Sequence, residues 1–126
     1  MTEIRYKNKV VGLLLRAIPG GSVPQTKDEE PLQLITLKHP KGKLLVAHMH
    51  KPVALKTNRV QECVVVRKGR IRMSLFGPDK KMFKEIILKS GDVFILQNGG
   101  HSFYFLEDSE FIEVKNGPKC ESRVLI

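Results

Sequence analysis

The sequence predicts an all-β protein built from short antiparallel strands that form a sandwich or a barrel. The chain has many short segments that are rich in β-branched and aromatic residues, and one of them, "RIRMSL", alternates between polar and apolar residues. Turn-forming sequences such as "RKGR", "GPDK" and "QNGG" separate these segments. No stretch of a dozen residues has a helical period. The chain of 126 residues suits one domain with one core.

Nine segments have the length and composition of strands. We expect strands at 10–17, 32–38, 43–49, 62–67, 70–76, 82–88, 92–96, 102–106 and 110–115. The polar segment 19–31 contains three prolines and two glycines, and it is expected to be a loop. No linker or internal repeat interrupts the pattern, so residues 1–126 are predicted to be a single domain. The first strand and the 19–31 loop precede the strands of the predicted barrel.

Composition and charge narrow the classes of partner. The net charge of +9 favours anionic partners, but "RIRMSL" alternates as a half-exposed strand does without any ligand. No basic stretch is interleaved with exposed aromatic residues, so we expect no nucleic-acid partner and favour a small anionic molecule. The apolar run "VVGLLL" is too short to cross a bilayer, and no apolar leader is evident. We therefore expect a cytoplasmic protein without a membrane partner, and its Cys63 and Cys120 are expected to be free thiols.

Two histidines end the apolar segment "GKLLVAHMH". Side chains at i and i+2 of a strand project from the same face, so His48 and His50 would share a face with Leu44 and Val46. Each imidazole has a donor and an acceptor to satisfy. Either the strand reaches water at this point, or the two rings hold a ligand.

The spacing of glycines, histidines and an acidic residue resembles the two motifs of the cupin family. Gly42 is followed by five residues and His48-x-His50, Glu62 precedes Gly69 by seven positions, and "QNGG" leads into His101. The resemblance implies a cupin-type jelly-roll barrel with one metal ion inside, bound by His48, His50, Glu62 and His101. Three imidazoles and a carboxylate suit a divalent first-row transition metal such as Fe, Mn, Ni or Zn, and they leave coordination positions open.

The sequence departs from these motifs at several positions. Eleven residues separate His50 from Glu62, where the family has three or four. Gln61 is therefore an alternative oxygen ligand, and strand parity does not decide between Gln61 and Glu62, because both are followed by apolar alternation. In the second motif, Gln97 replaces a proline and Phe105 stands where the family has an asparagine.

Three residues are candidates for binding a substrate. Arg59 lies on the long loop before the ligand Glu62 and is a candidate anion clamp. Gln97 and Tyr104 flank His101 and would orient a substrate. The tail "EFIEVKNGP" resembles the end of small single-domain cupins that accompany surface-polysaccharide biosynthesis.

These observations leave different classes of function open. The first is a metal-dependent enzyme acting on a small anionic or sugar-derived substrate. A variant is a metal-free nucleotide-sugar isomerase or epimerase, with His48 or His50 as the base and Tyr104 as the acid. The other class is a non-catalytic module that binds or senses a small ligand. A homodimer is expected in each case, because the edge strands of a small jelly roll need to be covered.

Overall fold

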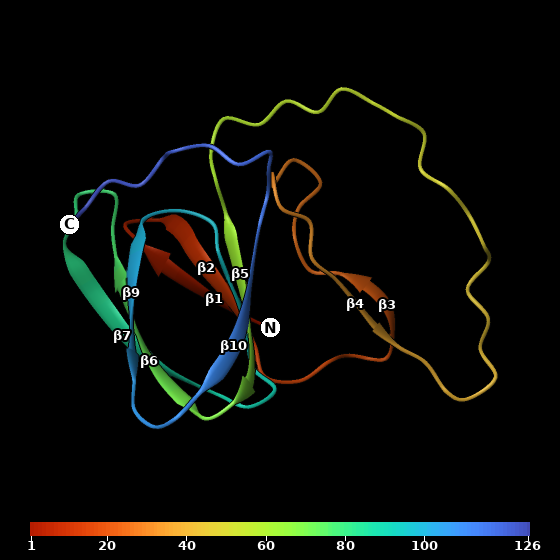
Figure 1. Ribbon diagram of the computed structural model, residues 1–126, viewed down its shortest axis with the longest axis horizontal. Coiled ribbons are helices and arrows are strands. Elements are labelled where there is room, and N and C mark those ends of the chain that lie inside the picture. Colours follow the sequence, from red (N-terminus) through yellow and green to blue (C-terminus); the bar gives the residue numbers. More distant parts are fainter.

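The computed structural model describes all residues of the chain, 1–126, and contains ten strands and no helix (Figure 1). The strands are β1 (Thr2–Tyr6), β2 (Lys9–Leu15), β3 (Gly21–Pro24), β4 (Ile35–Lys38), β5 (Glu62–Lys68), β6 (Arg70–Phe76), β7 (Met82–Lys89), β8 (Val93–Leu96), β9 (Gly100–Phe105) and β10 (Glu110–Lys115). One sheet has the order β1-β2-β8-β5-β10 and a second has the order β7-β6-β9, while β3 and β4 form a separate hairpin. All pairings are antiparallel.

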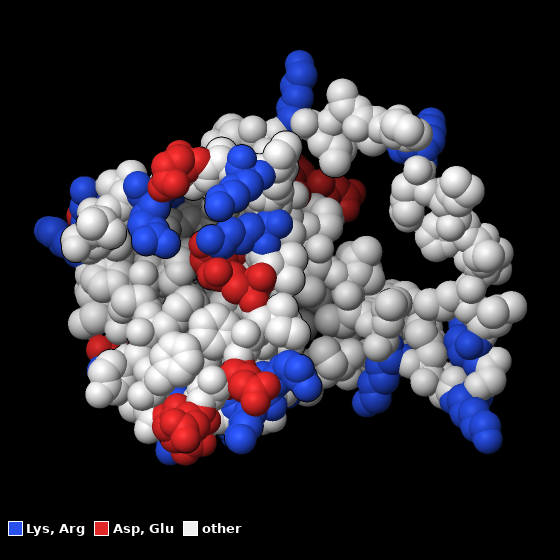
Figure 2. Space-filling view, viewed as in Figure 1, with Lys and Arg blue, Asp and Glu red and all other residues white.

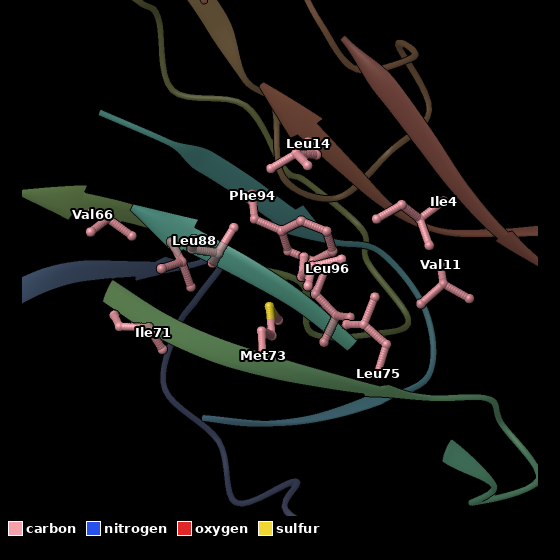
Figure 3. Packing of buried hydrophobic residues seen from close by; sticks show 12 residues of the cluster. Ile4, Val11, Leu14, Val66, Ile71, Met73, Leu75, Leu88, Phe94 and Leu96 are labelled. Atoms are coloured by element: carbon pink, nitrogen blue, oxygen red, sulfur yellow. The ribbon is translucent and has the colours of Figure 1, made fainter. Parts of the chain in front are cut away.

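The main core lies between the five-stranded and the three-stranded sheet. Alternate residues of each strand point into this space, as the period of two in the sequence requires. Figure 3 shows Phe94 of β8 in the middle of the cluster, with side chains from β6 and β7 facing it. The ring leaves no room on the neighbouring strand, because a Cβ atom at Gly12 would lie 2.2 Å from Phe94 Cζ.

A second apolar cluster covers the outer face of the five-stranded sheet. Its buried members are Leu13, Leu15, Cys63, Val93 and Ile95. Leu32 and Leu34 pack against this cluster from the segment that joins β3 to β4. The middle strands β5 and β8 are therefore covered on both faces, which explains why β8 is buried at all four positions.

The two ends of the sandwich differ. Beside β1 and β7, the Tyr6 and Phe83 rings lie 4.6 Å apart, and the Tyr6 hydroxyl donates a hydrogen bond of 2.7 Å to Asp79 Oδ2. Beside β9 and β10, the sheets are joined by ring contacts, with 5.0 Å between the centroids of Phe103 and Phe111, and by the contact of His101 with Glu62. No strand bridges this side. The all-β prediction is confirmed, but the structure does not form the closed jelly-roll barrel that was expected.

The strand expected at 43–49 is not formed, and the whole segment between β4 and β5 lacks strand structure. We call residues 39–61 the arm, because this part of the chain loops away from both sheets in Figure 1. Every residue from 41 to 59 is exposed, and Met49 is 94% exposed. A segment with strand propensity forms a strand only where a neighbouring strand accepts its hydrogen bonds, and none lies beside the arm.

Two further expectations need correction. The strand β1 was not expected. It forms because Thr2–Tyr6 pairs with β2 along its whole length and because Ile4, its one buried residue, packs into the core. The loop expected at 19–31 contains the short strand β3, which pairs with β4 from Gly21 to Pro24. The remaining expected strands are present with small shifts of their ends. No helix in the chain is long and apolar enough to cross a membrane.

Candidate metal centre

The first residue of β5, Glu62, lies on the face of the five-stranded sheet that points toward the main core. Glu62 shares a face with Val64 and Val66, which belong to the main core, whereas Gln61 lies on the opposite face. Gln61 is fully buried, and its Oε1 accepts a hydrogen bond of 3.1 Å from the backbone N–H of Leu32. The amide oxygen of Gln61 is therefore already engaged, and Glu62 is the residue that faces the candidate site.

His101 of β9 meets Glu62 across the open side of the sandwich. Nε2 of His101 lies 2.9 Å from Oε2 of Glu62, and both side chains are largely buried. Apart from this ion-pair contact, the buried Glu62 Oε2 has no hydrogen-bond partner. Two ligand atoms each about 2.1 Å from one metal ion, at a right angle, lie about 3 Å apart. The separation of these two atoms therefore matches that of neighbouring ligands of one ion.

Glu113 and Lys115 of β10 complete the cluster. Glu113 is opposite Val64 and Lys115 is opposite Glu62 in the register of β10 with β5, so both residues share the core-side face. The ligand atoms of Glu62, His101 and Glu113 all lie within 4.8 Å of one another. Lys115 Nζ is 3.3 Å from Glu62 Oε1 and 3.7 Å from Glu113 Oε2. The cluster thus combines two carboxylates, one imidazole and one ammonium group.

The charges of this cluster depend on one another. The contact with His101 lowers the pKa of Glu62 to about 2, although burial of the carboxylate acts in the opposite direction. Burial raises the pKa of Glu113, and the nearby Glu62 raises it further. The contact with Glu62 raises the pKa of Lys115. Glu62 is therefore an anion at neutral pH, and Figure 2 shows acidic and basic side chains side by side over β10.

The two histidines of the arm are not part of this cluster. His48 and His50 are exposed, their ring centroids are 5.0 Å apart, and His48 Nδ1 contacts the Val46 carbonyl oxygen at 2.9 Å. The rings are therefore close to each other, as the i and i+2 spacing predicts, but they lie on the segment that leaves the sandwich. That they share a metal ion with Glu62 and His101 stays a prediction.

The structure brings together two of the three candidate substrate residues. Arg59 and Gln97 line one pocket of about 190 Å³ with Val60, Leu96, Asn98 and Gly99. Arg59 also donates a hydrogen bond of 2.7 Å to Glu30 Oε2, which neutralises part of its charge. Tyr104 lies apart on the outer face of β9, where its ring centroid is 4.8 Å from the guanidinium carbon of Arg72.

Sequence reasoning missed Glu113 and Lys115. The signal was present, because Phe111, Glu113 and Lys115 occupy alternate positions and Phe111 is the apolar residue of that set. The pairing of β10 with β5 was needed to show which residues they face.

Comparison with known proteins adds no relative from which a site could be transferred. No protein-family model, curated protein or solved structure matches this chain. Membership of the cupin family therefore stays a prediction.

Proposed function

We propose that this chain is a metal-binding protein of the cupin type, in which Glu62 and His101 bind one divalent first-row transition metal ion. The observation that carries the proposal is the buried Glu62 Oε2, which has no hydrogen-bond partner and lies 2.9 Å from His101 Nε2. A buried carboxylate oxygen without a partner is costly, and a metal ion removes that cost. Glu113 is the nearest candidate for a third ligand.

The donor set suits this class of metal. One imidazole nitrogen with carboxylate oxygens binds Fe, Mn, Ni or Zn, and no thiol is present to select a softer ion. Two or three protein ligands leave coordination positions for a small molecule. Oxygen atoms of an anionic or sugar-derived ligand would fit those positions.

The surroundings of the cluster support an anionic ligand. Lys115 lies beside the two carboxylates, and the chain as a whole has a net charge of +9. The pocket that contains Arg59 and Gln97 lies beside Leu96, which is the register partner of Glu62. We propose that such a ligand is bound at the metal and is held by these basic and amide side chains, either for turnover or for recognition.

Metal uptake by purified protein tests this proposal. Equilibrium dialysis against Zn²⁺ or Mn²⁺, followed by elemental analysis, is expected to give one ion per chain. The Glu62→Gln and His101→Ala variants are expected to lose at least about tenfold in affinity, since each removes a ligand. Lys115→Met is expected to increase the affinity by about tenfold, because it removes a positive charge next to the ligands.

Glu85→Gln is the matched control, because Glu85 lies on β7, which β6 separates from β9 and its His101. Circular dichroism spectra confirm that each variant keeps its sheets. Equal affinity of the chain and of both ligand variants would refute the proposal, as would uptake that Glu85→Gln reduces to the same extent.

A further inference from the structure

The arm is an apolar strand-like segment without a partner. Leu44 is 79% exposed and Val46 is 78% exposed, and neither belongs to an apolar cluster. Residues 44–47 are all apolar, and His48 and His50 flank Met49, which is the composition of a short buried strand. Figure 2 shows this part of the chain mainly in white, and residues 39–61 contain no acidic residue. Such a segment, left in water, is expected to pair with an exposed sheet edge.

One edge of β9 is free and lies next to exposed apolar side chains. β9 pairs only with β6, and the backbone N–H of Leu106 donates to the Arg70 carbonyl oxygen at 3.0 Å. This bond sets the alternation of the ladder, so the N–H and C=O groups of His101, Phe103 and Phe105 point to the free edge. Those three residues also point their side chains toward the open side of the sandwich, where Phe103 and Phe105 contact Phe111.

The arm and the edge of β9 are complementary in an antiparallel arrangement. Leu44, Val46 and His48 then lie opposite Phe105, Phe103 and His101, so that apolar residues meet apolar residues and imidazole meets imidazole. The charges at the ends of the two segments also favour the antiparallel direction. Lysines at positions 41 and 43 begin the arm, and acidic residues at positions 107 and 108 follow β9.

The place where the arm begins indicates a second copy of the chain as the partner. The segment between β3 and β4 packs against the outer face of the five-stranded sheet through Leu32 and Leu34. β9 belongs to the other sheet, beyond the main core. Five residues from Lys38 to Lys43 span at most about 18 Å. In Figure 1 the arm and β9 accordingly lie on opposite sides of the sandwich.

We propose that residues 43–49 of one copy pair antiparallel with the free edge of β9 in a second copy, with His48 opposite His101. The exchange is reciprocal, so a two-fold symmetric pair covers both arms and both edges. His48 of one copy would then stand next to the Glu62 and His101 cluster of the other. This last consequence, that the exchange adds an imidazole to the metal centre, rests on the proposed function.

A designed disulfide tests the pairing directly. In the proposed register Ala47 lies opposite Ser102 at a non-hydrogen-bonded position, where Cα atoms are about 4.5 Å apart. That distance is within the range of disulfides. The Ala47→Cys and Ser102→Cys changes are combined in a Cys120→Ser background, which leaves only the buried Cys63. After oxidation, most of the protein is expected to run as a covalent dimer in non-reducing electrophoresis.

The two variants that carry only one of the new cysteines are the controls, and neither is expected to give the dimer that two disulfides link. Ala47→Cys with Tyr104→Cys covers a register that is shifted by two residues. A disulfide within one chain, seen as a faster-migrating monomer, would show that the arm closes on its own β9 and would overturn the proposal. Absence of any disulfide in both cysteine pairs would overturn it as well.

Sedimentation of the chain without added cysteines gives an independent result. A chain of 14.3 kDa is expected to sediment as a dimer at micromolar concentration, and Leu44→Asp is expected to make it monomeric. Leu125→Asp is the matched control, because Leu44 and Leu125 are both 79% exposed. A monomeric parent chain, or a dimer that Leu44→Asp does not weaken, would contradict the exchange. Neither readout depends on metal, so the metal proposal can fail without affecting this one.

Discussion

The arm and β5 each contain a run of four apolar residues, at 44–47 and 63–66, but they have different structures. Each run includes valine, yet Val64 of β5 is 1% exposed and Val46 of the arm is 78% exposed. β5 lies between β8 and β10 and is covered on both faces, whereas the arm has no neighbouring strand. The comparison teaches that strand propensity permits a strand, and that a neighbour with free backbone groups decides whether it forms.

The largest expected difference between the two regions is in the cost of removing an apolar side chain. Phe94→Ala is expected to lower the free energy of unfolding by about 3–5 kcal/mol, because it leaves a cavity in the core. Met49→Ala, which changes an arm residue that is almost fully exposed, is expected to change it by less than about 0.5 kcal/mol. Urea denaturation of both variants measures this difference. Similar losses in the two variants would mean that the arm is packed in solution.

Two glycines with positive φ sharpen the comparison. Gly69, between β5 and β6, has a φ of 91°, and a Cβ atom there would lie 2.6 Å from the Asp108 carbonyl oxygen. Gly42, in the arm, has a φ of 94° and no atom within 4 Å of such a Cβ. Gly69→Ala is expected to cost about 2–4 kcal/mol from backbone strain and steric overlap.

Gly42→Ala carries the backbone strain alone and is expected to cost about 1 kcal/mol or less, since the arm can relax. Thermal unfolding of both variants, with the unchanged chain as the reference, measures the two costs. A larger loss for Gly42→Ala than for Gly69→Ala would reverse the ranking of the two regions.

The smallest effect on stability is expected beside β1 and β7, where Asp79 of the β6–β7 turn contacts Tyr6 of β1. The Tyr6 hydroxyl holds the pKa of Asp79 below its usual value of 3.8. Because the pKa of Asp79 is lower in the folded chain, the contact stabilises the fold at pH values above the usual pKa. This stabilisation is lost as the pH falls through the lowered pKa. Asp79→Asn is therefore expected to lower the melting temperature slightly at pH 7 and not at a pH of about 2. Asp28→Asn, on an exposed loop, is the control, and equal effects at both pH values would contradict the expectation.

The sequence predicted most of the sandwich because its strands bury alternate residues. The segment that became β6 alternates clearly, and the segments that became β6, β7 and β10 are all bounded by turn residues. Tertiary pairing decided the other cases. The arm contains an apolar run of strand length but has no partner strand, and β3 forms only because β4 lies beside it.

The candidate metal centre was predicted in part. Glu62 and His101 were expected from motif spacing, and they lie together in the structure. Glu113 was missed because its role depends on the register between β10 and β5, which local patterns do not encode. Parity alone did not separate Gln61 from Glu62, because the sheet has apolar clusters on both faces.

Both ends of the arm are fastened to the folded body. β4 holds one end through its hairpin, and the buried Gln61 holds the other through bonds to Leu32 and Glu30. The arm is therefore a closed loop and has no loose end that could thread through another molecule. Two copies joined through such loops separate when each arm strand peels from the edge that it covers, and neither copy has to unfold to be released.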